Sequence, residues 1–192
     1  IMTNDAGVFM HEQGYFNVSA VPYSKTIEPL NRRKHLTNYI LNNQLSGITQ
    51  LSTYDYPGFE KVRSQFAEIV RDVVKAVLAL FPNYLTKTSI PIFEIFGFDF
   101  ILDDNLKPWL LEINQGPDFP LTPQHPLYGI LWEPFWQRVV EGFVEPTLEG
   151  KGRDARGFLQ VLDEKDTHQV PWLAQLKGKW FLHQVGHMIR IQ

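Results

Sequence analysis

The chain has 192 residues, 44% of them hydrophobic and 14% aromatic, so it carries enough apolar surface to fold rather than remain disordered. It contains no cysteine, which excludes a disulfide framework, a thiolate metal site and a cysteine nucleophile. The net charge of -3 gives no signature of nucleic-acid binding, and no apolar run is long enough to span a membrane. These features favour a cytoplasmic protein. Because the chain begins with Ile1 rather than methionine, we expect it to be a piece of a longer protein.

The N-terminal third is expected to hold a strand, an irregular stretch and a polar loop. Residues 8–16 read as a hairpin-like or edge strand with a bend at Gly14, and residues 17–34 are irregular. Residues 42–57 are rich in Asn, Ser, Gly and Thr, which predicts a polar loop.

Two helices are predicted further along the chain. Residues 59–81 repeat apolar side chains at intervals of three and four, which predicts a helix with one apolar stripe that ends at Pro82. Residues 127–144 predict a second helix, begun or kinked near Pro134.

The stretch FEIFGFDFILDDNLKPWLLEIN, residues 93–114, predicts a β-hairpin turning at Asp103–Asn105. A four-residue turn, Asp103 to Leu106, would pair Leu102 with Lys107 and place Glu112 opposite Gly97, whose missing side chain would clear space there. Side-chain alternation then gives the hairpin an apolar face, with Phe96, Phe98, Phe100, Leu102, Trp109, Leu111 and Ile113, and a polar face, with Asp99, Glu112 and Asn114.

The polar face needs an explanation, because two carboxylates a few Å apart repel each other unless a cation lies between them. Two acids and an amide oxygen suit a hard ion such as Mg²⁺, which in proteins usually also holds substrate phosphates. Alternatively, Asp99 is a bulge or cap residue and Glu112 a surface residue of an outer face. Residue types and spacing leave both interpretations open.

The hairpin sequence resembles a signature of the tubulin-tyrosine ligase family, which reads Phe-Gly-Phe-Asp and then Pro-Trp-Leu-Leu-Glu-(Val/Ile)-Asn. HLTNY, residues 35–39, resembles a second family motif, and GYFNVSAVPYS, residues 14–24, resembles the strand before it. The order and spacing of the motifs agree with the family over about residues 8–145.

The resemblance implies an α+β, ATP-grasp-like fold in which an antiparallel sheet with packed helices forms the C-terminal part, residues 1–149. It implies an ATP-dependent, peptide- or amide-bond-forming ligase that adds tyrosine, glutamate or glycine to a tubulin tail or a similar protein, and so a cytoskeleton-associated location. Its cofactors would be ATP and Mg²⁺, with the adenine-binding strand and a phosphate-gripping lysine upstream of Ile1. The metal ligands would be Asp99, Glu112 and Asn114, of which Glu112 and Asn114 are the expected catalytic residues. Thr37 and Asn38 would lie near the γ-phosphate or the acceptor.

Two departures from the family pattern leave a second class of function open. Asn17 and Asn43 stand where the family usually has arginine and lysine, cations expected to hold anionic groups. Arg32, Arg33 or Lys34 are candidate substitutes. The alternative is therefore a pseudoenzyme that kept the fold as a structural or assembly subunit.

Residues 150–192 are predicted to form a C-terminal extension that docks on the domain or on a partner in a larger assembly. They carry seven Lys or Arg against four Asp or Glu, a charge that we interpret as a solvated face rather than a nucleic-acid or membrane site. His183 and His187 have a spacing that suits a metal on a helix, but no carboxylate is placed to complete such a site.

Overall fold

The computed structural model describes residues 1–4, 7–19, 21–25, 37, 49–81, 84, 91–119 and 122–163. The fold is α+β with antiparallel sheets, as expected. It divides into two compact units, each made of separate chain segments. Unit 1 comprises residues 1–12, 60–118 and 138–192, and unit 2 comprises residues 13–59 and 119–137. Among the described residues, no helix is both long and apolar enough to cross a membrane.

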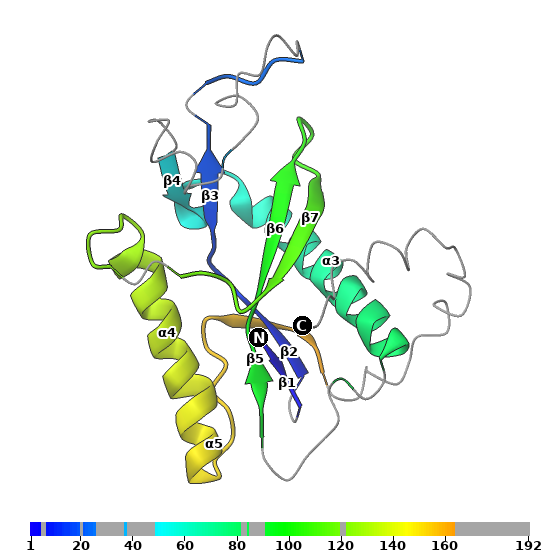
Figure 1. Cartoon of the computed structure of the whole chain (residues 1–192), viewed down its shortest axis with the longest axis vertical. Coiled ribbons are helices and arrows are strands. Elements are labelled where there is room, and N and C mark those ends of the chain that lie inside the picture. Colours follow the sequence, from blue (N-terminus) through cyan, green and yellow to red (C-terminus); the bar gives the residue numbers. More distant parts are fainter. Residues whose placement is uncertain are drawn as a thin grey trace. The chain divides into compact units, whose positions relative to one another are not determined.

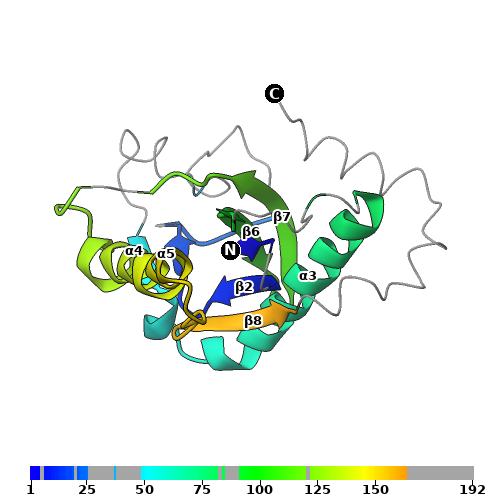
Figure 2. The ribbon, with the colours of Figure 1, turned by 90° about the horizontal axis from the view of Figure 1, so that it is seen from below.

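A four-stranded antiparallel sheet in the order β5-β1-β2-β8 forms part of unit 1. Its strands are β1 (Met2–Thr3), β2 (Gly7–His11), β5 (Phe93–Glu94) and β8 (Phe158–Leu162). Figure 2 shows β8, in orange, beside β2, although β8 lies within the sequence predicted to be a C-terminal extension.

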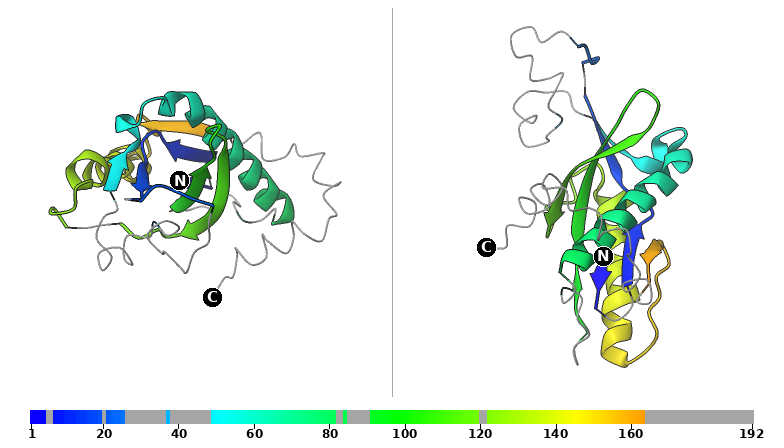
Figure 3. Two further views of the ribbon diagram at one scale, coloured as in Figure 1. Left: turned by 90° about the horizontal axis from the view of Figure 1, so that it is seen from above. Right: turned by 90° about the vertical axis from the view of Figure 1, so that its right-hand side faces the viewer.

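Helix α3 (Phe59–Leu80) follows the predicted helix closely and packs its apolar stripe on this sheet and on the hairpin. The hairpin consists of β6 (Phe96–Leu102) and β7 (Pro108–Gln115), and both lie beside α3 in Figures 1 and 3. The rings of Phe66 on α3 and Phe100 on β6 meet edge to face, with centroids 4.7 Å apart. The phenylalanine side chains of the hairpin's apolar face therefore pack on this helix. The buried core here comprises Met2, Val8, Ala67, Val70, Val74, Leu78, Val161 and Leu162.

Unit 2 contains a strand pair that the sequence did not predict. Strand β3 (Tyr15–Val18) pairs with β4 (Thr49–Ser52), which lies in the segment predicted to be a polar loop. Ser52 ends β4 and caps the short 3-10 helix η1 (Thr53–Asp55), because its Oγ accepts a hydrogen bond from the Tyr54 backbone N–H at 3.2 Å. The prediction of a loop is wrong for residues 49–52.

The second predicted helix is present and continues beyond residue 144. It runs through the π-helical turn η2 (Tyr128–Trp132), α4 (Glu133–Val139), the π-helical turn η3 (Val140–Val144) and α5 (Glu145–Glu149), and ends at Gly150 with φ of 65°. Each π-helical turn leads directly into a segment whose second residue is a proline, Pro134 or Pro146. A proline lacks the N–H that an α-helical turn needs, so we attribute the wider turns to the prolines.

A candidate metal centre on the hairpin

The pairing of β6 with β7 places Asp99 directly opposite Glu112, and Gly97 directly opposite Asn114. Paired residues of an antiparallel ladder project from the same face, so Asp99, Glu112 and Asn114 share one face. The predicted shared face is confirmed. The predicted register is wrong, because Leu102 pairs with Pro108 rather than Lys107.

The observed register differs from the predicted one in two steps, and the loop at the hairpin tip explains the step next to the turn. Asp103 N–H donates to the Lys107 carbonyl at 3.0 Å, so the turn is one residue longer than expected. The Asp103 carboxylate accepts hydrogen bonds from the backbone N–H groups of Asn105 (2.9 Å) and Lys107 (3.0 Å), and from the Trp109 indole N–H (3.0 Å). These hydrogen bonds, of which the one from Trp109 has the largest effect, hold the pKa of Asp103 below its ordinary value. Leu106 takes up the left-handed conformation, with φ of 59°.

A β-bulge explains the second step of the register shift, which lies further along the hairpin. Between the pairs Asp99–Glu112 and Phe100–Leu110, the extra residue Leu111 has no partner on β6. The longer turn has already put Leu110 opposite Phe100 and Trp109 opposite Ile101, and the bulge then brings Glu112 opposite Asp99. Trp109 and Leu111 are consequently 51% and 57% exposed, so their predicted place on the apolar face is wrong.

The two carboxylates of the polar face repel each other. Partial burial and the negative charge of Glu112, together with a hydrogen bond between the two carboxyl groups, raise the pKa of Asp99 above its ordinary value. The Asn114 amide N–H donates to Glu112 Oε1 at 3.3 Å, which leaves its Oδ1 without a hydrogen bond in the described part of the chain. No cation of the described residues forms an ion pair with either acid.

These residues fit a divalent cation. Among the described residues, no third His, Cys, Asp or Glu joins Asp99 and Glu112 to form a metal-binding cluster. The third ligand from the protein would therefore be the amide oxygen of Asn114. An all-oxygen set of two carboxylates and one amide on an exposed face suits Mg²⁺, which keeps several waters and accepts phosphate oxygens. A bound divalent ion would offset the repulsion between the carboxylates of Asp99 and Glu112.

Gly97 has a role other than the predicted one. It lies opposite Asn114 rather than Glu112, and a Cβ built on it would lie 2.9 Å from Pro117 Cβ. The space above Gly97 is therefore filled by Pro117, from the segment that follows β7.

Some of the remaining predicted site residues lie in the described part of the chain and others do not. Thr37 is half-buried and belongs to unit 2, whereas Asn38 lies outside the described residues. Asn17, where the resemblance led us to expect an arginine, is on β3, and its Oδ1 accepts a hydrogen bond from Gln50 Nε2 at 2.9 Å. Outside the described residues lie Asn43, the basic cluster 32–34, and the histidines 183 and 187.

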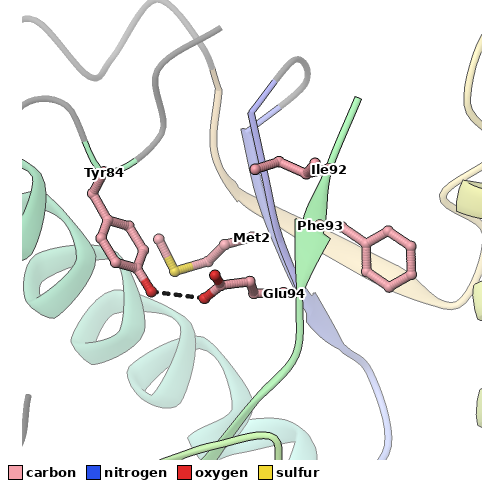
Figure 4. Close-up of a pocket in the computed structure, with 5 residues that line it drawn as sticks. All are labelled: Met2, Tyr84, Ile92, Phe93 and Glu94. Atoms are coloured by element: carbon pink, nitrogen blue, oxygen red, sulfur yellow. Dashed lines mark hydrogen bonds between the residues drawn. The ribbon is translucent and has the colours of Figure 1, made fainter. Parts of the chain in front are cut away.

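One polar group next to the site was missed by the sequence analysis. Glu94 Oε2 accepts hydrogen bonds from the Tyr84 hydroxyl at 2.7 Å and from Gln115 Nε2 at 3.1 Å. Figure 4 shows the Tyr84 contact beside Met2, Ile92 and Phe93. The available signal was an acid within the apolar run that leads into β6, the same signal that identified Asp99.

Comparison with known proteins agrees with the motifs of the hairpin. The sequence profile of the tubulin-tyrosine ligase family matches residues 2–151. The chain is 28% identical over 140 residues to the tubulin polyglutamylase TTLL13 of Mus musculus, covering 58% of this chain and 17% of that protein. It is 30% identical over 131 residues to the tubulin polyglutamylase ttll-4 of Caenorhabditis elegans, covering 57% of this chain and 22% of that protein. The match to TTLL6 of Mus musculus, another tubulin polyglutamylase, is 30% over 135 residues, 58% of this chain and 16% of that protein. The chain thus spans about a fifth of the length of these relatives. With a profile that matches most of its length, this chain belongs to the tubulin-tyrosine ligase family.

Proposed function

We propose that this chain is part of an ATP-dependent carboxylate–amine ligase that adds glutamate to the tail of tubulin or of a similar protein. The observation that carries the proposal is the shared polar face of Asp99, Glu112 and Asn114 on a hairpin with the family's signature sequence. The relatives are named tubulin polyglutamylases, which favours glutamate over the tyrosine or glycine that the family resemblance alone leaves open. A cytoskeleton-associated location in the cytoplasm follows from the proposed substrate.

In the proposed reaction, an acceptor carboxylate takes the γ-phosphoryl group of ATP and ADP leaves. The amino group of free glutamate then attacks the activated carbonyl carbon and a C–N bond forms. The bond between that carbon and the phosphate oxygen breaks, inorganic phosphate leaves with the oxygen, and the amine loses a proton. No side-chain nucleophile is required. Asp99, Glu112 and Asn114 would hold Mg²⁺, which offsets phosphate charge when it is bound. Thr37 and Asn38 are proposed to lie near the γ-phosphate or the acceptor.

The test uses the full-length parent protein with ATP, Mg²⁺, tubulin and, in turn, labelled glutamate, tyrosine and glycine. We expect label from glutamate to appear on a tubulin tail. Glu112→Gln keeps the shape but removes a full negative charge from the metal site, so we expect transfer to fall about 10- to 100-fold. Glu68→Gln, the same change on an exposed position of α3, is the matched control and should retain activity. If Glu112→Gln and Glu68→Gln both retain activity, the proposed site is wrong.

A pseudoenzyme is the second candidate, and the environment of Asn17 favours it. Asn17 is a neutral amide that is hydrogen-bonded to Gln50. It stands where the family resemblance leads us to expect a cation that holds an anion. This alternative predicts no label from any of the three amino acids, and recovery of anion binding in Asn17→Arg. If the folded wild-type protein binds no ATP and ligates nothing, the enzyme proposal fails and the scaffold interpretation stands.

A further inference from the structure

The carboxylate of Glu94 joins segments of unit 1 that are distant in sequence. Glu94 ends β5, Tyr84 follows α3, and Gln115 is the last residue of β7. One oxygen, Glu94 Oε2, accepts hydrogen bonds from both the Tyr84 hydroxyl and the Gln115 amide. Burial and the neighbouring Glu94 carboxylate raise the pKa of Tyr84, so its hydroxyl stays protonated and donates throughout the physiological pH range.

The three hydrogen-bonded residues Tyr84, Glu94 and Gln115 connect the core of unit 1 to the strand end that carries Asn114. The Tyr84 ring packs against the core cluster of α3, β1, β2 and β8. Gln115 pairs with Phe96, so its side chain leaves β7 on the face opposite Asn114, the preceding residue. The adjacent Gly116 N–H donates to the Ile95 carbonyl at 3.0 Å, which fixes the same strand end through the backbone.

We propose that Glu94 is a positioning residue that sets the orientation of Asn114 by clamping Gln115 from the far side of β7. The inference rests on the proposed metal site. Asn114 lies near the end of β7, where strands fray, and its amide already contacts Glu112. Fixing the side chain of Gln115 limits rotation of the strand end, so the Asn114 amide is held beside the two carboxylates. Partners of this kind, one step behind the ligands, commonly decide metal affinity.

The experiment measures metal affinity directly, as free Mn²⁺ by electron paramagnetic resonance during titration of the full-length protein saturated with a non-hydrolysable ATP analogue. Gln115→Met removes the donor without adding charge, and Gln115→Glu places a carboxylate against Glu94. We expect both to weaken Mn²⁺ binding about 10-fold. The swap Glu94→Gln/Gln115→Glu restores a donor and an acceptor with the original net charge, and should restore affinity. Lys61→Gln, on the exposed face of α3, changes net charge as Gln115→Glu does and should leave affinity unchanged.

The outcomes separate this inference from the proposed function. If Mn²⁺ binding depends on Glu112 but is unchanged in both Gln115 variants, the positioning role is wrong and the metal site stands. If Mn²⁺ binding does not depend on Glu112 either, the proposed site itself fails. A loss of affinity that the swap does not restore, and that follows the melting temperature of each variant, would reduce Glu94 to a general contribution to stability and overturn the inference.

Discussion

His125 in unit 2 is a buried imidazole that the fold keeps neutral. It is 7% exposed, and its Nδ1 accepts a hydrogen bond from the Leu127 backbone N–H at 3.1 Å, just before the second long helix. Burial lowers the pKa of His125 below its ordinary value of 6.5. The unfolded chain therefore binds the proton more readily, so the stability that neutral His125 contributes is complete above pH 6.5 and falls as the pH drops below that value.

We expect His125→Asn to weaken this pH dependence, because asparagine Oδ1 replaces the acceptor Nδ1 and does not titrate. The measurement is the urea midpoint at about pH 7.5 and about pH 5.5 for the wild type and the variant. The wild type should lose more of its midpoint on acidification than His125→Asn does. An equal loss in both proteins would assign the pH dependence to other groups.

Gly97 tests the close approach of Pro117 to the hairpin. In Gly97→Ala the new Cβ meets a rigid proline ring at 2.9 Å, so we expect unfolding free energy to fall by about 1–3 kcal/mol. Gly129→Ala is the matched control, because no atom lies within 4 Å of the added carbon in the helical turn η2. That change should be neutral or stabilise by about 0.5–1 kcal/mol. Chemical denaturation of both variants decides the matter, and an equal effect at the two glycines would contradict the packing described here.

At the scale of secondary-structure elements, the contact between α3 and the hairpin carries much of the unit 1 core. Phe66 is 8% exposed and meets Phe100 across this contact. We expect Phe66→Ala to destabilise the protein by about 3–5 kcal/mol, because it leaves a cavity that rigid neighbours cannot fill. Leu111→Ala, on the exposed bulge of the same hairpin, should change stability by less than about 0.5 kcal/mol. Similar midpoints for Phe66→Ala and the wild type in a urea titration would show that this contact is not a core contact.

The elements that the sequence predicted well are those whose pattern is local. The stripe of α3 repeats over many residues, and Pro82 marks its end, so its bounds could be read closely. Strand β4 was missed because Thr49, Gln50 and Ser52 show no apolar alternation. Its pairing with β3 joins segments that are distant in sequence, so no local pattern indicates it. The bulge at Leu111 was missed for a related reason, since a single extra residue leaves no mark on composition.

The candidate site shows the same division. The acids Asp99 and Glu112 stood out because charge in an apolar strand needs compensation, and the face they share survived an error in register. Their direct opposition did not follow from the sequence, because it depends on the loop that Asp103 organises and on the bulge. The contacts of Glu94 with Tyr84 and Gln115 join distant segments and could not be read from spacing at all. Thr37 and Asn38 were predicted from resemblance alone, and their roles stay predictions.

At the scale of the whole molecule, strand β8 shows that the four-stranded sheet needs residues beyond 150. Val161 on β8 is 3% exposed within the core, and the Arg71 side chain donates to its carbonyl at 2.8 Å. We expect Val161→Asp to destabilise unit 1 by several kcal/mol, on the order of the penalty for an unpaired buried charge. Leu159→Asp, on the same strand but 39% exposed, should be tolerated. Circular dichroism melts of the two variants provide the comparison, and a Val161→Asp protein as stable as Leu159→Asp would show that β8 is dispensable.

The alternation of chain segments between the two units has a practical consequence for protein engineering. The backbone passes from one unit to the other near residues 12, 59, 118 and 137. Neither unit is therefore a single stretch of sequence, and a fragment cut at any of these points leaves at least unit 1 incomplete. Expression of the hairpin with its full supporting core therefore requires residues from both ends of the chain, and a smaller version would have to replace residues 13–59 and 119–137 with linkers. A laboratory that trims the protein to a minimal fragment carrying the hairpin should design such an internal deletion rather than a terminal truncation.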